Sequence, residues 1–192
     1  MFFDPEIFPF ASALEESWLE VRTELEQLRP ANFIDWPEKN IYNHGWGVLG
    51  LYAFGQRLEE NCKLCPKTTK VVENIPGMIT AGFSSLAPGT YIGPHFGVSK
   101  AVLRCHLGVV VPDDNCAIRV DKETRNWQEG KCLIFDDTYE HEAWNRSNKT
   151  RIVLLVDFMR NNPTSEELVT GDQNVDHDYW INILRQKDVN LK

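Results

Sequence analysis

The sequence predicts a mainly β fold, either a β-barrel or a jelly roll, supported by helices at both ends of the chain. Three observations lead to this prediction. Residues 12–29 repeat apolar side chains at helical spacing. From residue 78 onwards, short runs rich in Val, Ile and Phe alternate with turn signals, which is typical of sandwiches and barrels. A polar tail begins near residue 161 and contains a second helical pattern over residues 177–187.

The first helix is expected over residues 12–29. Ser12 and Glu15 have the spacing of a capping box at its start. Pro30 follows its end, because proline cannot continue a helix. One apolar stripe along this helix would face the core, formed by Leu14, Trp18, Val21, Leu25 and Leu28.

The other elements follow from short β-like runs and the turns between them. Before the β region we expect a strand over residues 46–54 and a short helix that begins at Pro66 and ends before Pro76. Turn signals then divide the β region into strands near 78–85, 90–93, 101–111, 116–120, 131–135, 140–145 and 150–158. The 192 residues are expected to form a single domain with a helical N-terminal support, a jelly-roll core and a C-terminal tail with a helix, over residues 1–77, 78–160 and 161–192 respectively.

Composition and charge exclude several classes of partner. Hydrophobic residues make up 42% of the chain and charged residues 25%, which is ordinary for a globular protein. The formal net charge of -8 argues against nucleic acid and anionic membrane surfaces as the main partner, since both attract basic proteins. The longest apolar runs hold about five residues, so we expect no membrane span. The start of the chain also lacks the basic and apolar segments of a secretory signal.

The five cysteines are an odd number for a disulfide framework. Together with the missing secretory signal, this number predicts reduced thiols and a cytoplasmic protein. Cys62 and Cys65 have the spacing of a metal-binding or redox pair, but no second pair follows them. We therefore expect these two cysteines to be structural.

Three of the five histidines fall in the β region, namely His95, His106 and His141. In the strand expected over residues 101–111, side chains alternate between two faces. Arg104, His106 and Gly108 share one face, and apolar side chains occupy the other. A buried arginine beside a buried histidine is costly unless an anion lies next to them, so this face predicts an anion-binding pocket.

A second arginine, Arg151, opens a strand that is otherwise apolar. Two arginines at inward positions near histidines suggest a small pocket for a dicarboxylate, because a guanidinium group binds carboxylates through two parallel hydrogen bonds. Imidazoles are also common metal ligands, so the set fits a non-haem iron oxygenase with a keto-acid co-substrate. Such sites usually add a carboxylate to the two histidines. This chain has Gly97 at the usual place for it, two residues after His95.

Several short motifs follow one another between Leu86 and Phe158. They are Leu86-Ala-Pro-Gly-Thr90, Pro94-His-Phe-Gly97, Arg104-Cys-His-Leu-Gly108, Glu129-Gly-Lys131 and Phe135-Asp-Asp-Thr-Tyr-Glu-His-Glu142, with Trp144 and Arg151. In order and spacing they resemble the aspartyl/asparaginyl β-hydroxylase family of iron(II)- and 2-oxoglutarate-dependent oxygenases. The resemblance implies a double-stranded β-helix, which is a jelly roll of the cupin-like class.

The resemblance also implies a metal site. His95 and His141 match the two iron(II) ligands, and 2-oxoglutarate and O2 would be the co-substrates. Many family members have glycine in place of the carboxylate ligand, so Gly97 agrees with the family and would leave room for a water molecule at the metal. Oxidative decarboxylation of 2-oxoglutarate would give succinate and carbon dioxide and would drive the hydroxylation of a C–H bond.

The binding site for 2-oxoglutarate follows from the same resemblance. Arg151, with Ser84 beside it, matches the arginine that binds the distal carboxylate of 2-oxoglutarate. Arg104 and His106 match groups near the other carboxylate, which chelates the iron. The alternation of side chains had already placed these two residues on one face.

The substrate pocket departs from family members that hydroxylate aspartyl residues. Those members hold the acid with basic side chains at two places where this chain has Gly82 and Val102, so a less acidic substrate is expected. We expect hydroxylation of an unactivated C–H bond, at the β-carbon of an amino acid that is free, carrier-bound or in a short peptide. Two alternatives are the same chemistry on a lipid-like acyl group and a non-catalytic jelly-roll module that binds a metal or a small acid. The expected partner is a small-molecule or short-peptide substrate. The sequence does not choose between hydroxylation and the related reactions of halogenation and desaturation, nor does it give the oligomeric state.

Ordinary structural roles are expected for the other polar and aromatic residues near the motifs. Asp136 and Asp137 are expected to cap a turn. The alternative is a carboxylate ligand for the metal, supplied by Asp136, Asp137, Glu140, Glu142 or Asp157. Asp157 shares a face with Arg151 by alternation and is expected to pair with it. Roles outside the site are expected for Glu140, Glu142, Trp127, Trp144, His44 and His177.

Overall fold

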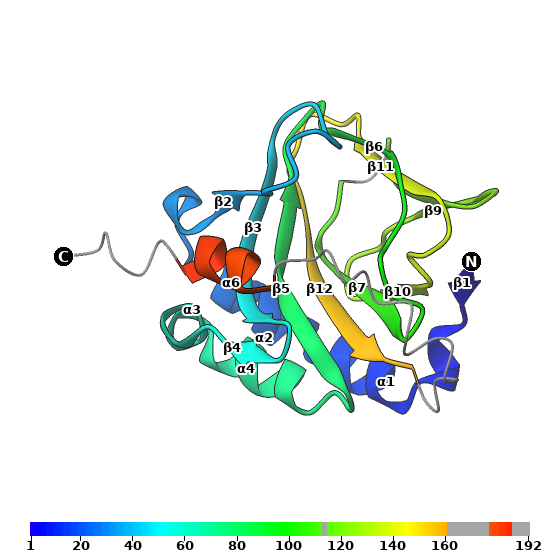
Figure 1. Ribbon diagram of the computed structural model, residues 1–192. Helices are drawn as coiled ribbons and strands as arrows, with labels where there is room; N and C mark the ends of the chain where they lie inside the picture. The colour runs from blue at the N-terminus through cyan, green and yellow to red at the C-terminus, as the bar shows by residue number, and fades with distance from the viewer. Residues whose placement is uncertain (113–114, 161–176, 186–192) are drawn as a thin grey trace.

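The computed structural model describes residues 1–112, 115–160 and 177–185. Two antiparallel β-sheets lie face to face and enclose an apolar interior, and helices α1–α4 lie against the outer face of the larger sheet (Figure 1). This arrangement is a jelly roll, so the predicted fold class is confirmed.

The larger sheet has eight strands within the described residues. Their order is β1-β10-β7-β12-β5-β3-β2, and β4 pairs with β3. Their bounds are β1 Phe2–Phe3, β2 Ile34–Asp35, β3 Trp46–Ala53, β4 Gln56–Arg57, β5 Met78–Leu86, β7 Val102–Val110, β10 Cys132–Phe135 and β12 Arg151–Met159. Strands β5, β12 and β7 lie inside the sheet, with a neighbouring strand at each edge. Their side chains alternate between the face covered by the helices and the face towards the interior.

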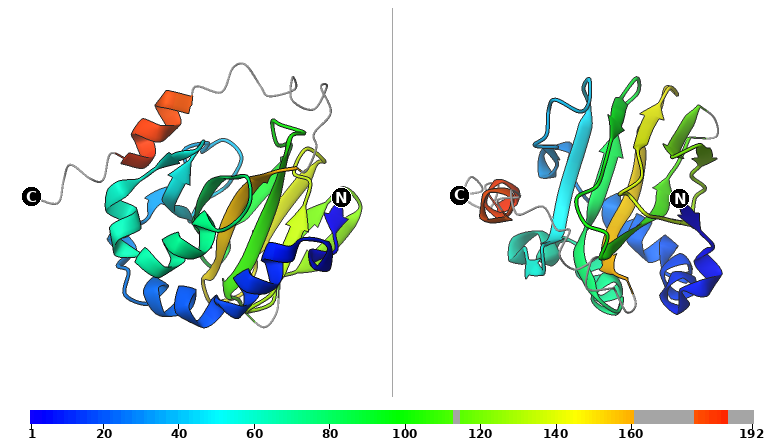
Figure 2. Two further views of the ribbon diagram at one scale, coloured as in Figure 1. Left: turned by 90° about the horizontal axis from the view of Figure 1, so that it is seen from below. Right: turned by 45° about the vertical axis from the view of Figure 1, so that its right-hand side comes forward.

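The smaller sheet closes the other side of the interior (Figure 2, right). Its order is β6-β11-β8-β9, with bounds β6 Tyr91–His95, β8 Cys116–Val120, β9 Glu123–Asn126 and β11 His141–Asn145. The tight turn between β8 and β9 contains Asp121 in the left-handed region, at φ 55°. Apolar side chains of both sheets meet in the interior, among them Trp46, Leu86, Ile118, Phe135 and Val153.

Four helices cover the outer face of the larger sheet: α1 Pro9–Glu16, α2 Trp18–Leu25, α3 Glu59–Leu64 and α4 Pro66–Glu73. Leu14, Val21 and Val72 are buried in the cluster that includes Phe83 and Leu154 of the sheet. The apolar stripe predicted for the first helical region therefore does face the core. This face of the sheet is used for stability, which leaves the interior between the sheets for chemistry.

A further helix, α6 (His177–Arg185), lies beside β3 (Figures 1 and 2). Ile181 is buried with Ala53 and Leu58, and Leu184 packs against the same cluster. The helix expected near residues 177–187 is confirmed over 177–185. The rest of the predicted C-terminal tail lies outside the described residues.

The prediction of one helix over residues 12–29 was wrong in its bounds. The chain forms two helices that meet at Ser17, the first beginning at Pro9 and the second ending at Leu25. The predicted capping box is absent, because residues 12–15 lie inside α1. Glu15 instead accepts hydrogen bonds from the Cys132 backbone N–H at 2.9 Å and from the Lys131 ammonium at 2.7 Å, which ties α1 to β10.

The predicted strands of the β region all form, with ends that differ from the prediction by at most two residues. The two-residue strands β1, β2 and β4 were not predicted, because so short a segment has no periodicity. Strand β9 was missed because its residues are polar, and α3 because a six-residue helix carries little pattern. No helix among the described residues is long and apolar enough to cross a membrane.

Candidate active site

His95 and His141 lie opposite each other, His95 at the end of β6 and His141 at the start of β11. Their ring centroids are 4.0 Å apart. The Nδ1 atom of His95 lies 2.9 Å from the Gly93 carbonyl oxygen, and Nδ1 of His141 lies 3.0 Å from the Tyr139 carbonyl oxygen. A carbonyl oxygen only accepts, so each Nδ1 carries the proton and each Nε2 keeps its lone pair. Histidines that ligate metals commonly show this arrangement.

Burial keeps both imidazoles neutral at pH 7. Burial lowers the pKa of His141 to about 3, and the neighbouring His95 contributes in the same direction. Burial also lowers the pKa of His95. Both rings therefore offer a lone pair to a metal ion without first losing a proton.

The third position of the expected metal site has no side chain. A Cβ atom added to Gly97 would overlap the carboxylate of Asp137. The space beside Gly97, where the sequence predicts a water molecule, therefore holds the Asp137 side chain. The residues that the structure describes contain no group of three His, Cys, Asp or Glu side chains arranged to hold a metal ion. The candidate metal donors in this part of the structure are the two imidazoles.

The Gly97→Asp variant tests this crowding. The new side chain would supply the usual carboxylate of a two-histidine site, but Asp137 occupies its place. We expect a loss of stability of roughly 1–3 kcal/mol and no gain in metal affinity. Urea unfolding and metal titration measure the two effects. The double variant with Asp137→Gly should recover the stability, and a single variant as stable as the wild type would contradict the position of Asp137.

Asp137 is held by Arg104, which also binds Asp157. The Arg104 Nε and Nη2 atoms donate to the two carboxylate oxygens of Asp157, at 2.7 and 2.9 Å. Arg104 Nη1 lies 3.2 Å from Asp137 Oδ2. The expected pairing of Asp157 with Arg151 was wrong, because Asp157 stands opposite Arg104 in the β12–β7 register. Arg104 thus lies on the predicted interior face, with its nitrogens turned towards two carboxylates.

Arg151 is buried, and no carboxylate of the described residues forms an ion pair with it. The residue is 2% exposed, its Nη1 donates to the Ser84 carbonyl oxygen at 3.1 Å, and its guanidinium lies 4.4 Å from the Trp127 ring centroid. The Ser84 hydroxyl accepts from Trp46 Nε1 at 3.0 Å. Burial lowers the pKa of Arg151 to about 10, so the group is still charged at pH 7. Its Nε atom has no hydrogen-bond partner among the described residues.

His106 is the second buried group with a free donor. Its Nδ1 atom accepts from Trp127 Nε1 at 3.2 Å. Indole N–H only donates, so the proton of the neutral ring is on Nε2. That Nε2 atom is buried and has no partner within the described ranges. Burial lowers the pKa of His106 well below its usual range, and the charges of Arg151 and Arg104 add to the effect.

Trp127 joins these two groups, since it touches Arg151 with its ring face and His106 with its N–H. The sequence predicted only packing for Trp127, and it does pack in the interior cluster. The hydrogen bond from Trp127 to His106 could not be predicted, because Trp127 lies in the β9–β10 connection, where the sequence has no periodicity. The Phe135 ring contacts both of the neighbouring histidine rings. Its centroid lies 5.1 Å from that of His106 and 6.1 Å from that of His141.

The two positions expected to line the substrate pocket, Gly82 and Val102, carry no charge. A Cβ atom at Gly82 would lie 2.5 Å from the Leu49 carbonyl oxygen, so β3 leaves no room for a side chain there. Val102 is half-buried at the start of β7. At Gly82, the close approach of the β3 backbone excludes a basic side chain altogether.

The remaining residues singled out in the sequence lie outside this arrangement. Asp136 accepts from the Thr138 N–H and hydroxyl, which caps the predicted turn. Arg119 pairs with Glu140 and Glu142. His44 is exposed near the Pro88 carbonyl oxygen. The five cysteines are free and buried. The side chain of His177 lies outside the described residues.

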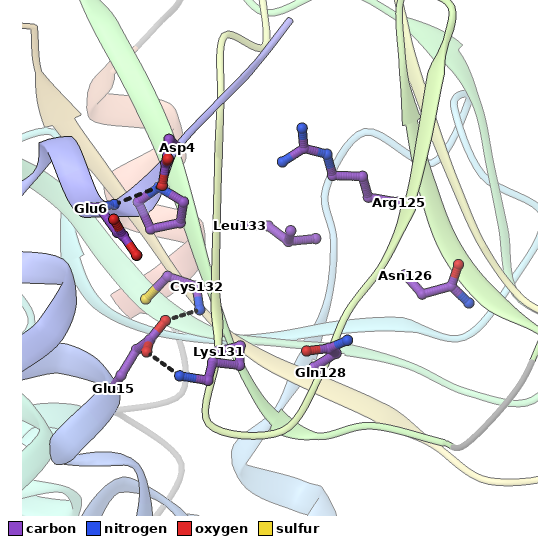
Figure 3. Close-up of a pocket in the computed structure, with 10 residues that line it drawn as sticks. Asp4, Glu6, Glu15, Arg125, Asn126, Gln128, Lys131, Cys132 and Leu133 are labelled. Carbon is purple, nitrogen blue, oxygen red and sulfur yellow. Dashed lines mark hydrogen bonds and ion pairs between the residues drawn. The ribbon is translucent and has the colours of Figure 1, made fainter.

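A separate depression of about 490 Å³ lies between the N-terminal segment and β9–β10 (Figure 3). Two of its acidic side chains have partners nearby: Glu15 accepts from the Lys131 ammonium, and Asp4 accepts from the Glu6 N–H. None of the histidines and arginines of the candidate site lines it. We therefore place the candidate site in the interior between the sheets.

Comparisons with known proteins identify the family to which this chain belongs. The family model described as "Aspartyl/Asparaginyl beta-hydroxylase" matches residues 15–161. The ornithine lipid ester-linked acyl 2-hydroxylase of Rhizobium tropici is 45% identical, over 82% of this chain and 60% of that protein. The human aspartyl/asparaginyl beta-hydroxylase is 39% identical, over 76% of this chain and 20% of that protein. The chain thus spans less than two thirds of the length of either relative.

A solved structure supports the fold alone. A Pseudomonas putida prolyl-4-hydroxylase superposes with a TM-score of 0.50 and 13% identity, over 78% of this chain and 98% of that chain. The family match carries the stronger conclusion, because it includes every candidate site residue from Gly82 to Arg151. The chain belongs to the aspartyl/asparaginyl β-hydroxylase family, which is a family of hydroxylases.

Proposed function

We propose that this protein is an iron(II)- and 2-oxoglutarate-dependent hydroxylase. The observation that carries the proposal is a pair of buried donors, Arg151 Nε and His106 Nε2, that have no partner among the described residues and belong to two side chains in contact with Trp127. A buried donor left unpaired costs about 1–3 kcal/mol, and a buried charge costs more. An acidic ligand that satisfies both donors would remove this cost.

2-Oxoglutarate has the chemistry that these donors require. The Arg151 guanidinium would bind its distal carboxylate, and the His106 N–H would donate to the end nearer the metal. His95 and His141 would hold iron(II) through their Nε2 atoms, which the backbone contacts of Nδ1 leave free. The Arg104–Asp157 pair holds Asp137 beside Gly97, next to this metal position.

When bound, iron(II) with O2 and 2-oxoglutarate supplies an oxidant strong enough to hydroxylate an unactivated C–H bond, with succinate and carbon dioxide as products. The residues of this chain position the reactants. The carbonyl oxygens of Gly93 and Tyr139 fix the orientation of the two imidazoles. The apolar side chains between the sheets exclude water from the reacting atoms.

We place a lipid-linked acyl chain first among the substrates. The relative named an ornithine lipid ester-linked acyl 2-hydroxylase is 45% identical to this chain. Gly82 and Val102 offer no base to an acidic substrate, and Arg104 already faces two carboxylates. An uncharged chain therefore fits these positions better than a second acid does.

The β-carbon of an amino acid is the second candidate. It is favoured by the human aspartyl/asparaginyl beta-hydroxylase, at 39% identity. A free amino acid, a carrier-bound one and a short peptide are all within this class. The two candidates differ in whether a charged group must be held near Gly82 and Val102.

The test is succinate formation by protein purified without oxygen, reconstituted with iron(II), and then given 2-oxoglutarate and air. Acyl lipids, amino acids and short peptides are compared as substrates, and the hydroxylated product is identified by mass spectrometry with and without chloride. We expect succinate to rise only with an acyl lipid. A rise with an amino acid or a peptide would favour the second candidate. Bound iron without any succinate would favour a binding module and overturn the proposal.

A further inference from the structure

Large apolar side chains are exposed beside the two candidate metal ligands. Phe96, directly after His95, is 64% exposed, and Val98 in the same loop is 52% exposed. Tyr139 is 41% exposed, and its carbonyl oxygen contacts the ring of His141. Each of these side chains therefore lies within three residues of a candidate ligand.

The two loops that carry these side chains lie side by side. The Gly97 N–H donates to the Asp137 carbonyl oxygen at 2.7 Å, which joins the β6–β7 loop to the β10–β11 loop. The pairing of His95 with His141 continues the same contact into the sheet. We call Phe96, Val98 and Tyr139 the apolar rim.

Most of the other exposed large apolar side chains lie on elements that carry neither histidine. Leu19 is 63% exposed on α2, and Ile7 and Leu64 are exposed on the N-terminal turn and on α3. Single exposed apolar residues are normal on protein surfaces. The apolar rim differs because its members flank the same pair of histidines.

We propose that the apolar rim docks on a lipid surface, from which an acyl chain reaches the two histidines directly. The proposal rests on the proposed function, and in particular on the acyl substrate. Tyrosine and phenylalanine partition well into the boundary between lipid headgroups and acyl chains. Lys100, exposed in the same loop, carries an ammonium group that can reach the phosphate oxygens of headgroups.

The size of the rim favours lipid over a protein partner. A stable protein interface buries about 800 Å² on each side, which three side chains do not supply. A transient contact with lipid needs only a few apolar groups. The net charge of -8 means that apolar contact, rather than attraction to anionic lipid, would supply most of the binding.

Sedimentation with phosphatidylcholine vesicles tests the proposal, using the full chain without metal or 2-oxoglutarate. We expect the wild-type protein to bind, and Phe96→Ser to need roughly tenfold more lipid for half-maximal binding. Val98→Ser should weaken binding in the same direction. Leu19→Ser is the matched control, because Leu19 is equally exposed on another face, and it should bind like the wild type.

Three results would overturn the proposal: no vesicle binding by the wild type, equal binding by Phe96→Ser, or an equal loss in Leu19→Ser. Gel filtration of Phe96→Ser adds a further test. A change of oligomeric state without a change in vesicle binding would assign the rim to contacts between copies of this chain. Because vesicle binding is read without metal, its failure is separate from a failure of succinate formation, which concerns the proposed function.

Discussion

The Arg151→Met variant is expected to raise the stability of the metal-free protein and to weaken the binding of 2-oxoglutarate strongly. In the wild type, the guanidinium is buried without a carboxylate, and its Nε has no partner among the described residues. Replacing a buried charge by an apolar side chain of similar length often stabilises a protein, here by roughly 1–4 kcal/mol. The same change removes the charged partner of the co-substrate, which is worth roughly 2–5 kcal/mol.

Two measurements separate the expected gain in stability from the expected loss of 2-oxoglutarate affinity. Urea unfolding of the metal-free protein gives the change in stability. Titration with 2-oxoglutarate should show affinity weaker by about 30-fold to a few thousandfold, as the free energies above convert at 1.4 kcal/mol per tenfold. 2-Oxoglutarate should also raise the Tm of the wild type but not that of the variant.

The matched control for this experiment is Arg146→Met, since Arg146 is exposed and lies over the ring of Trp144. That variant should bind 2-oxoglutarate like the wild type. Arg151→Lys keeps the charge but loses the planar fork, so it should fall between the wild type and Arg151→Met. If Arg151→Met binds 2-oxoglutarate normally, the co-substrate does not occupy the interior beside Trp127.

The His95→Ala variant is expected to lose metal-dependent turnover while keeping its fold. One of two imidazoles with an available Nε2 lone pair is removed, and the described residues offer no third group in place to replace it. Residues that only support a metal ligand typically cost 10–100-fold, so loss of a ligand should cost at least about 100-fold in succinate formation. Metal affinity, measured by titration with iron(II) under nitrogen, should fall in parallel.

His44→Ala is the control for this variant, because His44 is exposed and its Nε2 lies 3.4 Å from the Pro88 carbonyl oxygen. We expect it to keep full activity and metal affinity. Circular dichroism of both variants shows whether the fold is intact. A folded His95→Ala protein with wild-type iron affinity would remove His95 from the ligand set.

Much of the interior could be predicted from alternation along single strands. Arg104 and His106 were placed on one face of β7, and the structure has them on the face away from the helices. Cys105 and Leu107 are buried on the helical side. This prediction works because successive side chains of a strand point to opposite faces of the sheet.

Partners across the sheet could not be predicted in the same way. Asp157 was assigned to Arg151 by alternation, but it binds Arg104 because β12 is antiparallel to β7 in a particular register. Alternation gives the face of a side chain but not its neighbour. The neighbour depends on the pairing of strands that are far apart in the sequence.

The sequence by itself determined a mainly β fold, either a barrel or a jelly roll, and the order of its central strands along the chain. The family resemblance chose the jelly roll and gave the two histidines and two arginines their expected roles. These features depend on local periodicity, on turn residues and on motif order, all of which a single chain carries. Only the tertiary structure decided that Asp137 fills the space beside Gly97 and that Trp127 joins Arg151 to His106. The reason is physical, since each of these contacts joins segments that meet only when the two sheets close on each other.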